Sequence, residues 1–410
     1  MPELKENYDV IVVGGGPSGS ACALFLSRYG HNILLVDKAR FPRDKACGDA
    51  ITGKSKSILE ELNLVKAVES NPHGIFDGAL LIVNGQKFDF NFGWYGHVSR
   101  RIVFDNIIFQ EAKKTVDTIE GFTVTGLLFE DKKVVGIKGI DSESKEERTF
   151  RAKIVVGADG ANSVVAREVG LGTFTPKHHS SALRVYYKNI KNLSRKLELY
   201  FFESGEFGLV PGYFWIFPLE NGMANVGFGM STSSIQKRNV NIQEILFNEI
   251  KTNPLFVDRF KDADIVEGSL RGWNLPMVTA RRKMYGNGFV LLGDAASLID
   301  PFTGEGIGPG MVSAKVASQV ITEALTRKDY SEKELNKYQK IMWKTYVDPY
   351  LKYISLIRIV TNFKWVIRRA VKKLENDESF KQLMTMTLSG KKNRKITIWT
   401  ILKLLFKIIL

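Results

Sequence analysis

Three glycines near the start of the chain have the spacing of a phosphate-binding turn. Gly14, Gly16 and Gly19 follow a short apolar run and open a helical pattern. In such a unit the first glycine permits a tight turn, the second lets the backbone approach a pyrophosphate, and the third lets helix and strand pack closely. Pro17 and Ser18 are the first helical residues, and the free N–H groups and positive dipole at this end of the helix would bind the phosphates.

An acid ends the second apolar run of the same unit. Asp37 lies 18 residues after Gly19 and is followed by Lys38. At this position a carboxylate accepts the ribose hydroxyls and disfavours a 2′-phosphate. The unit therefore predicts a site for FAD or NAD rather than NADP.

Two further motifs pair a glycine with an aspartate at the end of an apolar run. Asp159-Gly160 comes first, and its alternative interpretation is an ordinary strand-to-helix turn with Ser163 near the helix cap. Gly293-Asp294 comes second, and its carboxylate could accept a hydrogen bond from a ribityl hydroxyl. Together with the first glycine turn they indicate one extended nucleotide site.

A glycine-rich loop leads into a later helix. Gly304, Gly306, Gly308 and Gly310 fall within seven residues, with Ile307 between them. Such a loop lets the backbone approach a flat ligand, and the helix N-terminus would stabilise the negative charge of a reduced flavin. The alternative is a flexible loop without a ligand.

The order GxGxxG, DG and GDA resembles the FAD-dependent proteins typified by para-hydroxybenzoate hydroxylase, over about residues 8–325. The resemblance implies bound FAD and a mixed α/β (α+β) fold. In that fold a Rossmann-type FAD-binding domain is interleaved with an antiparallel-sheet substrate domain. It also implies an arginine near the flavin at a helix start. Arg101, followed by Phe104 and Asp105, matches that position, and the adjacent Arg100 is the alternative.

The predicted FAD-binding domain is discontinuous. It takes residues 1–72, 97–175 and 270–330, the substrate domain takes 73–96 and 176–269, and a basic helical C-terminal region takes 331–410. Hydrophobic periodicity predicts a hairpin and several helices. The hairpin spans 74–92, and the helices span 17–29, 54–68, 101–114, 242–260 and 308–325, followed by helix from 333 onward with breaks at Pro349 and at 389–393.

The segment Pro211–Pro218 reads PGYFWIFP and resembles the P-x-x-Y-x-W-x-F-P signature of geranylgeranyl reductases, which saturate C=C bonds of isoprenoids. Alternation along a strand places Tyr213, Trp215 and Phe217 on one face, where they would bind a polyene. The alternative is that the three rings are core residues of the sheet.

A second segment resembles the same family. Lys45-Ala46-Cys47-Gly48 resembles its cysteine–glycine motif after the first nucleotide site, although Asp49 stands where a second glycine is usual. The resemblance implies hydride transfer from N5 of reduced FAD to one alkene carbon and a proton to the other. Tyr213, Trp215 and Cys47 are the candidate catalytic residues, with flavin or water as alternative proton sources.

Other flavin chemistries stay open. The main rival is a monooxygenase, or a halogenase, acting on an aromatic or lipophilic substrate, and a non-redox flavin-dependent cyclase is a third possibility. NAD(P)H or ferredoxin would reduce the flavin, and NAD(P)H would bind transiently because the sequence shows no second GxGxxG. The five histidines have no metal-binding spacing, so we expect no metal.

The positive charge is concentrated at the C-terminus. Residues 331–410 carry 18 basic and 6 acidic side chains, or +12 of the net +14, leaving +2 for the first 330 residues. This distribution suits an anionic surface better than nucleic acid. The tail 396–410, about 22 Å of helix, is too short to span a bilayer but could lie in its interface or dock on protein. We expect a cytoplasmic protein that touches the inner face of the membrane.

Overall fold

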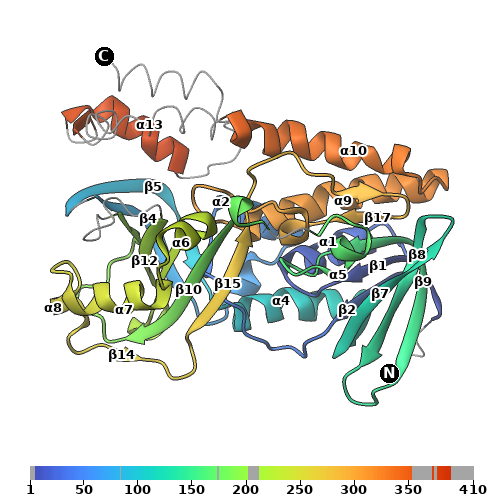
Figure 1. Ribbon diagram of the computed structural model, residues 1–410, viewed down its shortest axis with the longest axis horizontal. Coiled ribbons are helices and arrows are strands. Elements are labelled where there is room, and N and C mark those ends of the chain that lie inside the picture. Colours follow the sequence, from blue (N-terminus) through green and yellow to red (C-terminus); the bar gives the residue numbers. More distant parts are fainter. Residues whose placement is uncertain are drawn as a thin grey trace.

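Two sheets lie next to each other in the molecule, one on each side of Figure 1. The computed structural model describes residues 5–83, 85–172, 175–201, 212–352, 372–373 and 376–388. One sheet is largely parallel and flanked by helices, and the other is largely antiparallel. This arrangement confirms the predicted mixed α/β fold with an antiparallel second sheet.

The first sheet has the order β16-β17-β9-β1-β2-β6, and the β7–β8 hairpin joins it through β9. Its parallel strands β1, β2 and β17 are apolar runs, as is the end of β9, because strands buried on both faces of a parallel sheet are apolar throughout. The strands are β1 (Asn7–Val13), β2 (Ile33–Asp37), β6 (Asp117–Glu120), β7 (Phe122–Glu130), β8 (Lys133–Asp141), β9 (Glu147–Gly157), β16 (Tyr285–Gly286) and β17 (Phe289–Leu291).

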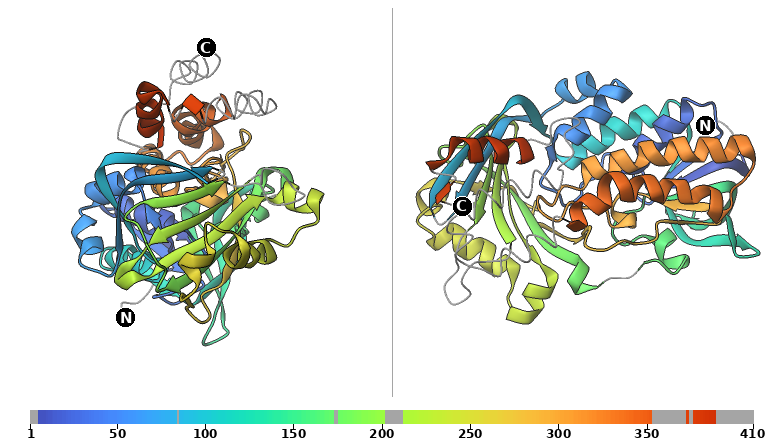
Figure 2. Two further views of the ribbon diagram at one scale, coloured as in Figure 1. Left: turned by 90° about the vertical axis from the view of Figure 1, so that its left-hand side faces the viewer. Right: turned by 90° about the horizontal axis from the view of Figure 1, so that it is seen from above.

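Helices cover this sheet in a layer that is clear on the right of Figure 1 and from above in Figure 2. Helix α1 packs against both α4 and α9, and α10 packs on α9. The helices of this half are α1 (Pro17–Ser27), α2 (Gly53–Leu62), α3 (Val65–Glu69), α4 (Arg101–Lys113), α5 (Val164–Glu168), α9 (Ile307–Arg327) and α10 (Glu332–Met342), with the turn η4 (Gly293–Ala296).

The second sheet has the order β14-β10-β13-β12-β11-β4-β5-β3, with β15 also paired to β10. Its strands are β3 (Ala50–Ile51), β4 (Gly74–Val83), β5 (Gln86–Val98), β10 (His179–Lys188), β11 (Leu197–Phe201), β12 (Gly212–Pro218), β13 (Ala224–Ser231), β14 (Asp264–Ile265) and β15 (Arg271–Pro276). Three helices and two short turns accompany it: α6 (Thr232–Arg238), α7 (Ile242–Thr252), α8 (Val257–Phe260), η1 (Pro176–His178) and η3 (Glu220–Gly222).

The two faces of this second sheet have different partners. Phe214 and Phe228 pack in a core that includes Phe256 and Phe260 beside α7 and α8. The opposite face turns toward the first sheet and lines a cavity. Strands of both sheets alternate along the chain, as an interleaved fold requires. The exact domain limits given above stay a prediction.

Several predicted elements differ in detail from the observed ones. The helix expected at 54–68 is interrupted at Asn63, whose φ of +61° ends α2. The helix expected at 242–260 is two helices, because α7 ends at Thr252 and α8 begins at Val257. The hairpin extends past 92, to Val98.

The predicted helix break at Pro349 is wrong. Helical backbone continues from α10 through the wider π-turn η5 (Trp343–Val347) and past Pro349 to residue 352. A proline ring clashes with the carbonyl four residues earlier, and a π-turn that contains that residue, Thr345, loosens the turn there.

The last described helix is α13 (Glu378–Leu388), which lies along β5 in both views of Figure 2. The predicted break at 389–393 and the amphipathic tail 396–410 lie outside the described residues. Among the helices that the structure describes, none combines the length and apolar character needed to cross a membrane.

The contact between α1 and β1 depends on Gly19. A Cβ atom on Gly19 would lie 1.8 Å from the carbonyl oxygen of Gly14. We expect Gly19→Ala to lower the unfolding free energy by at least about 2 kcal/mol, because the helix must move away from the strand. Urea denaturation of the cofactor-free chain measures the change.

Gly16→Ala is the matched control. A Cβ atom there would meet only the Arg43 Nη2 atom, at 3.4 Å. The cofactor-free stability of this variant should stay within about 0.5 kcal/mol of the parent. Equal losses for the two variants would contradict the packing role of Gly19.

Candidate functional site

The three glycine–aspartate motifs meet at one edge of the first sheet. Val13 of β1 is in register with Gly157 of β9, and Gly157 is in register with Leu291 of β17. These strands are parallel, so the turns that follow them lie next to each other. The motif residues Asp159 and Asp294 therefore face one cavity with the first glycine turn.

The first glycine turn leaves an open backbone surface. Gly14 has a φ of +103°, and a Cβ atom on it would lie 2.4 Å from the Ala158 carbonyl oxygen. Gly16 is open, and no side chain of the described residues caps the first turn of α1. Pro17 and Ser18 of this turn line the cavity. Free N–H groups at a helix N-terminus beside an open glycine suit a phosphate group.

Two of the predicted ligand carboxylates bind backbone within the described structure. Asp37 accepts hydrogen bonds from the Gly15 and Ala39 N–H groups, at 2.7 and 2.8 Å. Asp159 accepts one from the Val164 N–H at 2.6 Å, next to Ser163, which caps α5 by accepting from the Ala166 N–H. The alternative interpretation of this segment, a strand-to-helix turn with Ser163 near the helix cap, is thus observed. Both residues, with Lys38 and Gly160, also line the cavity, and their cofactor contacts stay a prediction.

Two arginines share one buried carboxylate above the glycine turn. Arg101 binds Asp105 through two hydrogen bonds, and Arg43 binds the same carboxylate at 2.6 Å. Burial alone would raise the pKa of Asp105, but the two guanidinium groups outweigh it and hold that pKa below its ordinary value. Of the two candidate arginines, Arg101 lines the cavity, whereas Arg100 pairs with Glu220, and a role of Arg101 at the flavin stays a prediction.

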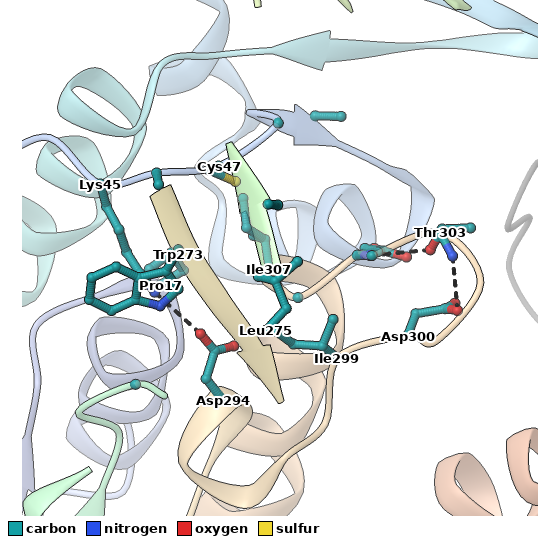
Figure 3. Close-up of a pocket in the computed structure, with 18 of the residues that line it drawn as sticks. Pro17, Lys45, Cys47, Trp273, Leu275, Asp294, Ile299, Asp300, Thr303 and Ile307 are labelled. Carbon is teal, nitrogen blue, oxygen red and sulfur yellow. Dashed lines mark hydrogen bonds and ion pairs between the residues drawn. The ribbon is translucent and has the colours of Figure 1, made fainter. Parts of the chain in front are cut away.

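Sequence reasoning missed Arg43 and its neighbour Lys45. The Lys45 Nζ atom lies 3.3 Å from Asp294 Oδ2 and 5.5 Å from the ring centre of Trp273. Figure 3 shows Lys45 and Trp273 together above Asp294, on the side of the cavity away from Thr303. The basic run after Asp37 was the available signal, but nothing local indicated which of its residues turn inward.

The glycine-rich loop forms the far wall of this cavity. Gly304, Gly306 and Ile307 line it, and no described side chain caps the start of α9. Gly308 does not line the cavity. It faces Glu305 and Lys54 instead, which a Cβ atom on this residue would contact.

Polar side chains hold this loop in place. Asp300 accepts hydrogen bonds from the Phe302 and Thr303 N–H groups and from Tyr350, at 2.9, 3.3 and 2.6 Å. Tyr213 donates to the Thr303 carbonyl at 2.5 Å. The loop therefore contacts both the second sheet and the helical segment after α10.

Strand β12 shows the predicted alternation. Tyr213, Trp215 and Phe217 line the cavity, while Phe214 and Ile216 point into the core beside α7 and α8. Other strands complete an apolar wall around these rings, in a continuous cavity of about 1900 Å³. The additional apolar lining residues are Phe76, Phe92, Trp94, Leu197 and Leu199. Pro211, the first residue of the predicted signature, lies outside the described residues.

Asp49 occupies a conformation that normally favours glycine. Its φ is +65°, and its side chain is fully buried beside Cys47 and Gly48, which line the cavity. The carboxylate accepts hydrogen bonds from Tyr186 and Asn225, each at 2.7 Å. Burial raises the pKa of Asp49 to about 7, against the opposing effect of nearby positive charge. The aspartate therefore adopts the positive φ that this loop requires, and its carboxylate adds hydrogen bonds that a glycine could not make.

The arrangement fits a dinucleotide with a flat ring system at one end. The open N-termini of two helices, α1 and α9, both face the cavity, the glycine turn precedes α1, and the Tyr213 ring of the aromatic wall contacts the loop before α9. Within the described residues, no group of three histidine, cysteine, aspartate or glutamate side chains is arranged to hold a metal ion.

Comparisons with known proteins agree with this geometry. A family model described as "FAD binding domain" matches residues 7–341. The chain is 32% identical over 348 residues to a digeranylgeranylglycerophospholipid reductase of Thermoplasma volcanium, covering 82% of this chain and 83% of that protein. It is 30% identical to a menaquinone reductase of Mycobacterium tuberculosis, covering 78% and 77%. The crystal structure of a geranylgeranyl bacteriochlorophyll reductase-like protein from Thermoplasma acidophilum superposes with a TM-score of 0.77, at 29% identity over 97% and 96% of the two chains.

The raised pKa of Asp49 predicts a pH-dependent stability. An unfolded aspartate has a pKa near 3.9, whereas folded Asp49 has one of about 7. The folded state thus keeps a proton that the unfolded chain has lost. The unfolding free energy should fall, by up to about 4 kcal/mol, as pH rises from about 4 to about 7, and this contribution is level outside that range.

Asp49→Asn removes this titration while keeping an acceptor oxygen. We expect the difference in unfolding free energy between pH 5 and pH 8 to be smaller in the variant than in the parent, as measured by urea denaturation. A variant with the same pH dependence as the parent would show that Asp49 is ionised throughout.

Proposed function

This chain belongs to the FAD-binding-domain family and is an FAD-dependent oxidoreductase, and we propose that it saturates C=C bonds of a prenyl chain of the geranylgeranyl type. The prenyl chain would belong to an isoprenoid lipid or a prenyl diphosphate. One observation carries the proposal: the aromatic face Tyr213–Phe217 forms an apolar wall of the same cavity that holds the nucleotide motifs. The names of the relatives support this class of substrate.

The chain's own residues divide the binding of FAD between two helix ends. Gly16 and the start of α1 would bind the pyrophosphate, with Arg43 above them. The loop at Gly304–Ile307 and the start of α9 would bind the ring system. Reduced FAD supplies a hydride equivalent for the alkene. Arg101, Asp159 and Asp294 complete the proposed set of cofactor contacts.

The aromatic wall would bind and orient the polyene. Trp215 and Phe217 are almost fully buried, at 6% and 8% exposure. Little water therefore contacts these rings, and an apolar chain can pack beside them without a polar group having to be desolvated. A positive charge that develops on the alkene during reduction is stabilised by aromatic ring faces. The apolar lining of the wall would also limit the access of bulk water to the reacting carbons.

Two side chains hold a proton close to this wall. Burial raises the pKa of the Tyr213 phenol and of the Cys47 thiol, although the charge of Arg101 partly offsets the effect on Cys47. Both groups therefore stay protonated at neutral pH, on Oη and Sγ. A raised pKa also makes each a weaker acid, so water is the competing proton source.

The partners follow from the same proposal. A hydrophobic substrate would reach the enzyme from a membrane, and the basic C-terminal region would make a peripheral contact with that surface at the cytoplasmic side. NAD(P)H or ferredoxin would supply the electrons. The menaquinone reductase relative makes the prenyl chain of a quinone a second candidate substrate.

An anaerobic assay tests the proposal against its rivals. Dithionite-reduced holoenzyme is incubated with a geranylgeranyl phospholipid, geranylgeraniol or menaquinol, whose ring is already reduced, and the product is weighed by mass spectrometry. We expect a gain of two mass units per saturated bond. Hydroxylation and halogenation require oxygen, so a product that forms only after oxygen is admitted would overturn the proposal. A cyclised product of unchanged mass would also overturn it.

Trp215→Ala tests the aromatic wall itself. We expect turnover of the prenyl substrate to fall by about five- to thirtyfold, because the variant loses ring contacts that are worth roughly 1–2 kcal/mol. Trp343→Ala is the matched control, since this tryptophan packs near Arg281 and does not line the cavity. Equal turnover of the parent and Trp215→Ala would contradict the assignment.

A further inference from the structure

The segment 44–49 carries Cys47 and is held on the second sheet by two buried polar anchors. Arg184 of β10 is 1% exposed and binds both carboxylate oxygens of Asp44, at 2.8 and 3.0 Å, as well as the Lys45 carbonyl. At the other end Asp49 binds side chains of β10 and β13. The segment is thus fixed at both ends while its middle faces the cavity.

Asn225 of β13 links this segment to the aromatic wall. It is fully buried, and its amide nitrogen donates to the Cys47 carbonyl at 2.8 Å and to Asp49 at 2.7 Å. Its amide oxygen accepts from the indole N–H of Trp215 at 2.8 Å. Both donor hydrogens and the acceptor of one side chain are therefore used.

The backbone of β13 provides a seat for the same indole. Trp215 is paired across the strands with Gly227, and a Cβ atom on Gly227 would lie 2.1 Å from the indole Cζ2 atom. Any larger residue would force the ring away from the strand. Gly227 below and Asn225 beside the N–H group together leave the indole one orientation.

The Asp49 carboxylate determines which way the Asn225 amide points. Reversing the amide would place its oxygen against the Asp49 carboxylate and the Cys47 carbonyl, and its NH₂ group against the indole N–H. All of these contacts would be repulsive. Tyr186 donates to the same Asp49 oxygen and holds the carboxylate in place.

We propose that Asn225 is a positioning residue that fixes the Cys47 segment and the Trp215 indole relative to each other, and that Asp49 orients its amide. This inference rests on the proposed function, because it gives both groups their place beside the reacting alkene. It assigns a role to three residues outside the aromatic signature, namely Asp49, Asn225 and Gly227.

Two measurements on the holoenzyme test the link without substrate. The first is the alkylation rate of Cys47 by iodoacetamide, followed by mass spectrometry. Cys22, the other cysteine of the chain, is fully buried and serves as internal reference. The second is the indole N–H signal of Trp215 in a ¹⁵N correlation spectrum, identified among the six tryptophans by its loss in Trp215→Phe.

Asn225→Asp separates the two halves of the link. The variant keeps an acceptor for the indole but loses both donors to the segment and places a second carboxylate against Asp49. We expect Cys47 alkylation to rise at least about tenfold, because losing a buried hydrogen bond favours local opening. Trp215→Phe keeps the donors and should change the rate less than about twofold.

Asp49 variants separate the polar contact from the backbone conformation. Asparagine tolerates a positive φ and keeps an acceptor oxygen, whereas glycine relieves the backbone but removes the acceptor. We expect Asp49→Asn to retain the parental alkylation rate and indole signal. Asp49→Gly should alkylate at least about tenfold faster and shift the signal. A parental result for Asp49→Gly would overturn the proposal even if Asn225→Asp fails to fold.

Tyr200→Phe is the control for general loss of stability. Tyr200 lies on the opposite face of the sheet, where it donates a buried hydrogen bond to Glu198. Its removal should leave Cys47 alkylation and the Trp215 signal unchanged, and a rise equal to that of Asn225→Asp would contradict the positioning role. If both probes behave as expected and no prenyl substrate is reduced, the proposed function fails while the positioning role stands.

Discussion

A charged side chain is costly to bury unless an opposite charge or hydrogen bonds compensate it, and this constraint decides how the two sheets meet. Arg184 is buried on the second sheet, and its partner Asp44 comes from the loop that leaves the first sheet after β2. Asp105 is buried below the same loop and is matched by Arg101 and Arg43. If the loop between β2 and β3 left the second sheet, the buried Arg184 would lose Asp44, and if it left the first, Asp105 would keep only Arg101.

This junction gives the cavity two chemically different ends. On the side of β1, backbone N–H groups and arginines face the open glycine turn and suit anionic phosphates. On the side of β12, aromatic rings face the cavity, and Asn225 bonds to both the Trp215 indole and the Asp49 carboxylate. An anionic cofactor and an apolar substrate can thus occupy one continuous space without either having to cross the other's environment.

Local patterns predicted the parts of this structure that depend on neighbouring residues. The glycine turn and the inward face of β12 follow from spacing and alternation, and the fold class follows from the family resemblance of the three motifs. Asn225 could not be found in this way, because its partner Asp49 lies 176 residues away and nothing near either residue indicates the contact. The helix through Pro349 was missed for a related reason, since a π-turn has no reliable sequence signal. Arg43 and Lys45 were visible as charges, but their direction depends on tertiary structure.

The left-handed conformation of Asp49 makes the residue type at this position depend on its neighbours. An aspartate at a positive φ is less favourable than a glycine by about 1 kcal/mol, so replacing a glycine there is a loss unless the new carboxylate finds donors at once. Tyr186 and Asn225 supply those donors. Without the Tyr186 hydroxyl and the Asn225 amide, glycine would therefore be the more favourable residue at position 49.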